Sequence, residues 1–277
     1  MKVISTEKIP IKIWTEDIEE SALEQTKHLA NLPFAFKHIA IMSDVHKGMG
    51  MPIGGVLATK NVVICNAVGS DIGCGVCVVK TSLTELDKDT LKKIMGEIRK
   101  VIPVGFNHHR ESQGLEYMPQ VGTLELGVQG EVNIPGLPIV SREYNSALKQ
   151  VGTLGGGNHF LSIEKGSDGF IWIMIHSGSR NLGKQVADHY NKLAVGLNQK
   201  WFSQVPKEWE LAFLPIESEE GKAYLREMNY CVEFALANRK LMMDRIKNIF
   251  YDVIYGKDKP VDPLFEPMIN IAHNLAS

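Results

Sequence analysis

Three short apolar segments of this chain are each followed at once by a cluster of glycine and polar residues. Residues 38–44 lead into SDVHKGMG, residues 61–69 into GSDIGCG, and residues 170–176 into HSGSR. Apolar runs of this length, ended by glycine or polar residues, predict buried strands. Because functional side chains gather in loops and at strand ends, the three clusters predict a site at the ends of these strands.

The rest of the chain adds helices to these strands. Apolar residues recur at helical spacing in several segments, and residues 103–138, dense in glycine, proline, asparagine and glutamine, predict mostly loop. We find no internal repeat and no linker, so we expect an α+β fold: one mixed α/β domain over residues 1–277 with a central mixed sheet flanked by helices. The further segments are a strand over 76–83 and helices over 16–30, 82–101, 141–152, 181–199 and 222–255, the last long enough to be interrupted.

Composition restricts the class of protein. With 277 residues, 44% of them hydrophobic, the chain can bury a sizeable core. A net charge of −2 argues against a dedicated nucleic-acid coat, so any polyanion must be bound by a local patch. No apolar run reaches the length of a membrane span and the start lacks a secretory pattern, which predicts no membrane partner and a cytoplasmic location.

The GSDIGCG cluster carries two candidate metal ligands, Asp71 and Cys74. Glycine permits a tight turn in which the carboxylate and the thiolate converge, and a thiolate can bridge two ions. The mixture suits zinc, or manganese if histidines are added. The alternative is a glycine turn between two strands with a buried cysteine. Cys77 completes a C-x-x-C pattern, but with no second pair we interpret it as a core residue, and a disulfide framework is not expected.

Two further clusters suit phosphate. In GTLGGGNHF (152–160), consecutive glycines expose backbone N–H groups, His159 is a candidate ligand and Asn158 a candidate donor to a phosphoryl oxygen. In HSGSR (176–180), His176 leaves the strand and Arg180 offers a planar fork for phosphate. The alternatives are a flexible linker with an incidental histidine for the first cluster, and a structural turn or a Ser–His hydrolase for the second. The sequence lacks the G-x-S-x-G pattern of a nucleophile elbow, which argues against the hydrolase.

Two more segments become candidates for the same site only because they occur together with these clusters. Asp44 and His46 lie two apart at a strand end, hence on one face, and His273 lies in INIAHN. D-x-H at 44–46 and G-N-H at 157–159 partly resemble the calcineurin-like metallophosphoesterases, but that family's G-D-x-x-D segment has no counterpart here.

A second family matches all the motifs in order. From near residue 10 to its end the chain resembles the RtcB-type RNA ligases, which are GTP- and manganese-dependent enzymes. They join RNA 3′-phosphate or 2′,3′-cyclic phosphate ends to 5′-hydroxyl ends in tRNA splicing and RNA repair, some with an activating partner, archease. The motifs that carry the resemblance are HIAIMSDVHKGMGMPIGGV, AVGSDIGCGV, GTLGGGNHF, HSGSRNLG and INIAHN.

The resemblance implies a role for each matched residue. Cys74 would bridge two Mn²⁺ ions, although the same ligand types also suit Zn²⁺. Asn158 would contact the nucleotide phosphate, Arg180 the terminal phosphate of the RNA, and Asp44 would assist proton transfer or orient a ligand. The residues implied to complete the two coordination shells are Asp71, His159, His176 and His273.

Two departures from the family pattern stand out. The family's nucleophilic histidine, which forms a covalent guanylate, lies beyond the motif that matches INIAHN, and this sequence ends at Ser277, so we expect no guanylylation by this chain alone. Ser162 stands where the family usually has a guanine-reading glutamate, with Glu164 on the same face if the segment is a strand. A two-metal phosphoesterase and a non-catalytic RNA-end binding protein therefore remain as alternatives.

Overall fold

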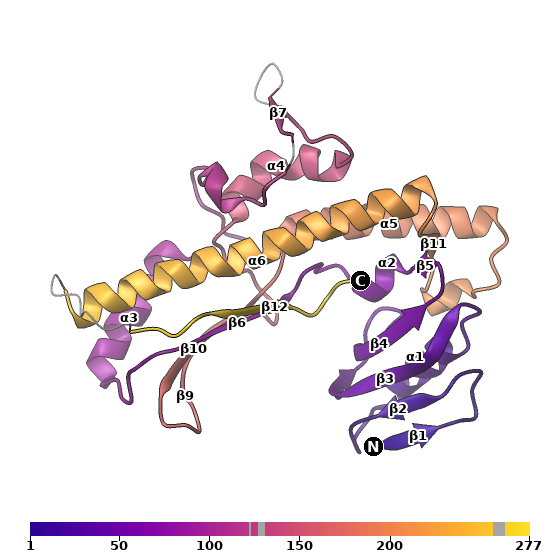
Figure 1. The fold of residues 1–277 in the computed structure, drawn as a ribbon, viewed down its shortest axis with the longest axis horizontal. Helices are drawn as coiled ribbons and strands as arrows, with labels where there is room; N and C mark the ends of the chain where they lie inside the picture. The colour runs from indigo at the N-terminus through magenta and orange to yellow at the C-terminus, as the bar shows by residue number, and fades with distance from the viewer. Residues whose placement is uncertain (122, 127–130, 257–263) are drawn as a thin grey trace. The chain divides into compact units, whose positions relative to one another are not determined.

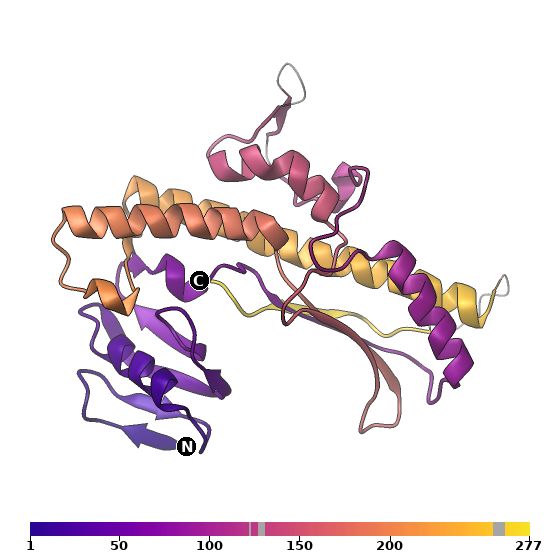
Figure 2. The same cartoon turned by 180° about the vertical axis from the view of Figure 1, so that it is seen from behind.

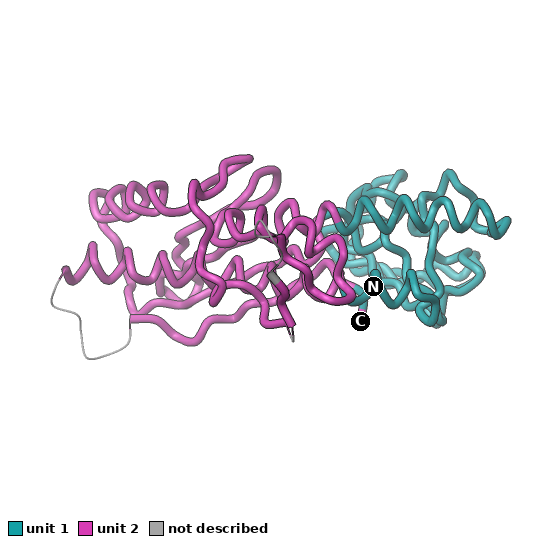
Figure 3. Tube along the Cα trace, turned by 90° about the horizontal axis from the view of Figure 1, so that it is seen from above, with its two compact units in different colours: residues 1–70, 186–226, 276 teal, residues 71–185, 227–275, 277 magenta. Residues whose placement is uncertain are grey.

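The computed structural model describes residues 1–121, 123–126, 131–256 and 264–277. The chain divides into two compact units, shown in different colours in Figure 3. The first unit contains residues 1–70 and 186–226, and the second contains residues 71–185 and 227–275. Helices α5 (Arg180–Lys200) and α6 (Glu219–Ile254) contribute residues to both units. The single-domain organisation expected from the sequence stays a prediction.

The first unit is built on a four-stranded sheet in the order β1-β2-β3-β4 (Figure 1). Strand β2 pairs parallel with β3, and helix α1 connects them, as a parallel crossover requires. The helix buries Leu29 against Ile39 and Ile41 of the sheet. The elements are β1 (Lys2–Ile4), β2 (Ile11–Ile13), α1 (Glu20–Ala30), β3 (Ala35–His46) and β4 (Ile53–Thr59).

The predicted strand over residues 61–69 is wrong. Strand β5 covers only Val62–Val63, where it pairs with β11 (Leu214–Pro215), and a short helix α2 (Cys65–Val68) follows. A short buried apolar run has no periodicity that separates strand from helix, which explains the error. The 3₁₀ helix η2 (Lys207–Trp209) completes the unit.

The second unit holds a four-stranded antiparallel sheet in the order β12-β6-β10-β9. One face packs on α3 and α6, and Figures 1 and 2 show α6 running along the sheet. Cys77 and Ile175 from the sheet meet Ile98 of α3 and Met242 of α6 in this core. The elements are β6 (Gly75–Lys80), α3 (Lys88–Val101), β9 (Phe160–Lys165), β10 (Ile171–Ser177) and β12 (Ile269–Ala272).

The mixed α/β fold class is confirmed, with the strands of the described ranges spread over two four-stranded sheets and two small pairs. Helix α3 begins later than predicted because Asp87, whose carboxylate accepts hydrogen bonds from the N–H groups of Asp89 and Thr90, caps it. Helix α6 is a single helix of 36 residues. The predicted 103–138 loop also contains η1 (Leu115–Tyr117), β7 (Glu125–Leu126) and β8 (Val132–Asn133), although residues 122 and 127–130 lie outside the described ranges. Helix α4 (Pro138–Gln150) follows.

In the described parts of the chain, we find no helix that is both long enough and apolar enough to cross a membrane.

Candidate metal centre

Antiparallel pairing in the second unit brings three predicted ligands to one edge of the sheet. Cys74 precedes β6, His176 is the second-last residue of β10, and His273 directly follows β12. In the register, Val76 lies opposite His176, and Gly75 lies opposite both Ser177 and Ala272. The start of β6 therefore meets the ends of its two neighbours.

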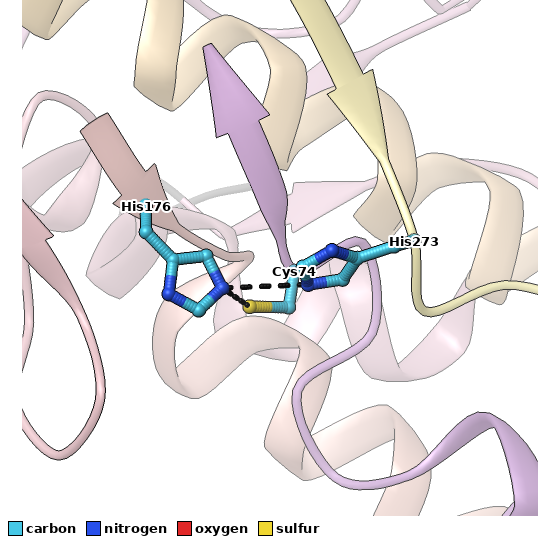
Figure 4. A group of neighbouring side chains, drawn as sticks. All are labelled: Cys74, His176 and His273. Carbon is cyan, nitrogen blue, oxygen red and sulfur yellow. Dashed lines mark hydrogen bonds between the residues drawn. The ribbon is translucent and has the colours of Figure 1, made fainter. Parts of the chain in front are cut away.

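The side chains of these three residues point toward one another (Figure 4). The Sγ atom of Cys74 lies 3.1 Å from Nε2 of His176, and this nitrogen lies 3.4 Å from Nε2 of His273. Three potential ligand atoms that converge in this way can hold one metal ion.

A second triad uses the same cysteine. His159 immediately precedes β9, whose first residue Phe160 pairs with His176, so it lies at the same edge of the sheet. Its Nε2 lies 3.7 Å from Sγ of Cys74 and 2.7 Å from Oδ2 of Asp71. Within each triad the potential ligand atoms lie within 4.8 Å of one another. Cys74 is thus the one residue common to both triads.

The donor chemistry fits a pair of divalent ions. Nδ1 of His176 lies 3.0 Å from the main-chain oxygen of Asn158, and a proton on Nδ1 for that bond leaves the lone pair of Nε2 facing Cys74. A backbone carbonyl bonded to the outer nitrogen is typical of metal-binding histidines. Thiolate, imidazole and carboxylate together suit zinc or manganese.

The surroundings shift the pKa values of the two acidic candidate ligands, Cys74 and Asp71, in opposite directions. Burial raises the pKa of the Cys74 thiol far above its ordinary value, the Asp71 carboxylate adds to this effect, and Arg239 opposes it. Burial alone would also raise the pKa of Asp71, but its hydrogen bond to His159 and the nearby charges outweigh burial, so this pKa is lowered. Both shifts favour a charged carboxylate and a neutral thiol near neutral pH, so a metal ion held by this sulfur would displace the thiol proton.

Glycines allow the ligand-bearing turns to approach one another. A Cβ atom on Gly178 would collide with the Asp71 carboxylate, and one on Gly155 would collide with the Arg180 guanidinium and lie 2.7 Å from Nδ1 of His159. Gly155 also has a φ of +96°, which only glycine adopts without strain. The glycine-rich pattern therefore has a packing reason in both turns.

The remaining predicted residues lie as follows. Arg180 donates from Nε to Oγ1 of Thr153 and from Nη2 to the carbonyl of Gly105. In this structure its guanidinium therefore contacts the loops that contain these two residues. Asn158 is exposed, and its backbone oxygen contacts His176. Asp44 lies in β3 of the first unit. The roles that the resemblance implies for all three stay predictions.

Two other expectations are settled by burial. Cys77 is fully buried in the core, as predicted, and all four cysteines are free thiols. Ser177 and Ser179 are fully buried, and their hydroxyls donate to the carbonyls of Leu154 and Ile72. This burial argues against either serine as the nucleophile of a hydrolase.

Strand β9 places Ser162 and Glu164 two apart on one strand, hence on the same face, as expected.

Comparison with known proteins adds the family. The sequence profile described as tRNA-splicing ligase RtcB matches residues 25–277. The chain belongs to this family.

Individual relatives agree with the RtcB assignment. An RNA-splicing ligase RtcB1 of Escherichia coli is 33% identical over 286 residues, an alignment that covers 99% of this chain and 68% of the relative. The RNA-splicing ligase RtcB of Escherichia coli K12 is 32% identical with the same coverage. The tRNA-splicing ligase RtcB of Thermococcus kodakarensis is 28% identical, with 97% of this chain and 64% of the relative covered. The chain thus spans about two thirds of the length of these relatives.

Sequence reasoning missed two buried residues behind the centre, Asn238 and Arg239 of α6. The available signal was a run of three polar residues, Asn238 to Lys240, between apolar residues of the helical stretch ALANRKLMM, of which the first two are buried. Such a pair at a core-facing position requires polar partners.

Proposed function

We propose that this chain carries a two-metal centre that binds the terminal phosphate of RNA for the ligation typical of RtcB enzymes. The observation that carries the proposal is the position of Cys74, which belongs to both groups of potential ligands. A single thiolate between two triads is suited to holding two ions side by side. Family membership supplies the class of substrate.

Each residue has a defined part in the proposal. Asp71 and His159 would hold one ion, His176 and His273 would hold the other, and Cys74 would offer its thiolate to both. Two Mn²⁺ ions at this position would neutralise phosphate charge and align attacking and leaving oxygens for in-line displacement.

Three residues outside the triads complete the proposed machinery. Asn158, exposed beside the centre, contacts the phosphate of the nucleotide, which we propose is GTP. The Arg180 guanidinium reaches the terminal phosphate of the RNA from its place between the Thr153 and Gly105 loops. Asp44 assists proton transfer or orients a ligand.

The proposed substrates are RNA strands with a 3′-phosphate or 2′,3′-cyclic phosphate, joined to a strand with a 5′-hydroxyl. Damaged RNA and tRNA halves carry such ends. A cytoplasmic location and assistance by archease belong to the same proposal.

Binding of RNA ends tests the proposal at the level of this chain. With Mn²⁺ present, we expect an oligonucleotide with a 3′-phosphate to bind more tightly than the same oligonucleotide with a 3′-hydroxyl. The preference should vanish in Cys74→Ala and persist in Cys77→Ala, which removes a thiol that no triad uses. Equal affinity for both ends in the wild type would contradict the proposal.

Product analysis then separates the activities. Incubation with a 3′-phosphate strand, a 5′-hydroxyl strand, GTP and Mn²⁺ gives a joined strand if this chain performs ligation. Release of inorganic phosphate without joining would indicate a phosphoesterase, and unchanged bound RNA would indicate an end-binding protein. Radiolabel from GTP that stays on the denatured protein would show that a residue of this chain is guanylylated.

A further inference from the structure

Two consecutive polar residues of α6, Asn238 and Arg239, lie with no exposed surface behind the candidate metal centre. Their helical neighbours Met242 and Met243 belong to the apolar core of the second unit. Burial lowers the pKa of Arg239, which shows that the charged form loses solvation here. A buried cation of this kind needs hydrogen bonds, and Nε and Nη1 of Arg239 make them, whereas its buried Nη2 has no partner among the described residues.

Arg239 bonds to three segments that each carry a predicted ligand. Its Nη1 donates to the carbonyl of Gly73 at 2.9 Å and to the carbonyl of Ser177 at 2.7 Å, and its Nε donates to Oδ1 of Asn270 at 2.7 Å. Gly73 and Ser177 directly adjoin the ligands Cys74 and His176. Asn270 lies on β12, the strand that ends just before His273.

Asn238 bonds to two segments, one of which, residues 177–178, Arg239 also contacts. Its Oδ1 accepts hydrogen bonds from the N–H groups of Gly152 and Thr153, at 2.7 and 3.1 Å. Its Nδ2 donates to the carbonyls of Thr153 and Gly178, at 3.2 and 3.1 Å, and to Oγ of Ser177 at 3.2 Å. The first segment leads into the loop of His159.

The second segment that Asn238 holds contains Gly178, which packs directly against the Asp71 carboxylate. Asn238 therefore fixes the surroundings of Asp71 and His159, whereas Arg239 fixes those of Cys74, His176 and His273. Charged hydrogen bonds to carbonyls are stronger than neutral ones. Because metal sites tolerate displacements of only about 0.5 Å, such anchoring bears directly on affinity.

We propose that Asn238 and Arg239 are positioning residues with separate tasks: Arg239 sets the Cys74–His176–His273 site, and Asn238 sets the Asp71–Cys74–His159 site. The inference rests on the proposed metal centre. It goes beyond that proposal because it assigns to each of the two ion sites a different residue of α6 that holds the ligand-bearing segments in place.

The test measures each site by itself. In a His159→Ala background the intact triad is Cys74–His176–His273, and in a His273→Ala background it is Asp71–Cys74–His159. Arg239→Lys and Asn238→Ala are added separately to each background. Co²⁺ affinity is measured by calorimetry, and the thiolate-to-cobalt absorption band reports whether Cys74 is bound to the ion.

Loss of outer contacts to metal ligands costs on the order of 10- to 100-fold in affinity. We expect Arg239→Lys to cause a loss of this size in the His159→Ala background, and a smaller loss in the His273→Ala background, where Cys74 is the one ligand that it supports. Asn238→Ala should show the opposite pattern. Equal losses at both sites from both variants, or no loss at either, would overturn the proposal.

Two controls guard against trivial results. Asn198 is also a buried asparagine, bonded to the carbonyls of Ala194 and Phe213 in the first unit, so Asn198→Ala should lower the melting temperature and leave Co²⁺ affinity unchanged. If Arg239→Lys fails to fold, Asn270→Ala removes the bond that Arg239 makes to β12, together with the bond from Asn270 Nδ2 to the carbonyl of Leu236, and should still weaken the site that contains His273.

Failure of the metal centre itself would appear differently from failure of the positioning roles. In that case the wild-type chain would not bind two Co²⁺ ions, before any α6 variant is compared.

Discussion

The Sγ atom of Cys74 lies 3.1 Å from Nε2 of His176 within one triad of the candidate metal centre, and the same cysteine also belongs to the other triad. This contact follows from the antiparallel pairing of β6 and β10, in which Val76 lies opposite His176. The cysteine is placed by a turn and the histidine by a strand end. Their separation is therefore controlled by sheet register and by the conformation of the GSDIGC turn.

Removing a ligand of one triad should leave the other triad in use. We expect Asp71→Ala and His273→Ala each to reduce Mn²⁺ binding from two ions to one, measured by equilibrium dialysis with metal analysis, because neither residue belongs to both groups. Cys77→Ala serves as the control, since it removes a buried thiol outside both groups and should retain two ions. Loss of both ions in Asp71→Ala or His273→Ala would show that the sites are not separable.

Metal binding should release a proton from Cys74. Burial and Asp71 raise the pKa of this thiol, so it is neutral until an ion binds. Affinity should then rise by about tenfold per pH unit between about pH 7.5 and 9, because the thiol is still protonated there and each bound thiolate releases one proton. Calorimetry in two buffers of different ionisation enthalpy measures the released proton, and affinity that stays flat over this range would contradict the account.

The close approach of Gly178 to Asp71 can be tested by adding one methyl group. Gly178→Ala places a Cβ atom against the Asp71 carboxylate and should weaken the ion held by Asp71 and His159, with the other ion retained. Gly96→Ala is the matched control, because a Cβ there meets nothing within 4 Å. In the interior of α3 this control should stabilise the protein by about 0.5–1 kcal/mol. Thermal unfolding and metal titration of both variants give the comparison, and unchanged affinity in Gly178→Ala would refute it.

The sequence predicts the positions of most helices and strands, but it does not predict which strands pair with one another in each sheet. The apolar run at 170–176 and the helical spacing at 181–199 and 222–255 all correspond to observed elements. The short strands β1, β2 and β12 have only three or four residues each, too few to show an alternating pattern. The sheet of the second unit pairs β6 with β10 and β12, strands that lie far apart in the sequence, and no local pattern records such pairings.

The candidate site was predictable as a set of motifs, since unusual glycine and polar clusters stand where strands end. The structure brings Asp71, Cys74, His159, His176 and His273 into two groups, and their use as ligands stays a prediction. Arg239 could not be found in this way. Its contribution comes from hydrogen bonds to carbonyls such as that of Gly73, which lies 166 residues away in the sequence.

The position of the metal ions relative to Cys74 tests the central claim most directly. Crystals of the chain grown with Mn²⁺, measured at the manganese absorption edge, should show two anomalous peaks that both lie within bonding distance of Sγ of Cys74. A single peak, or two peaks of which only one contacts this sulfur, would contradict a centre bridged by Cys74.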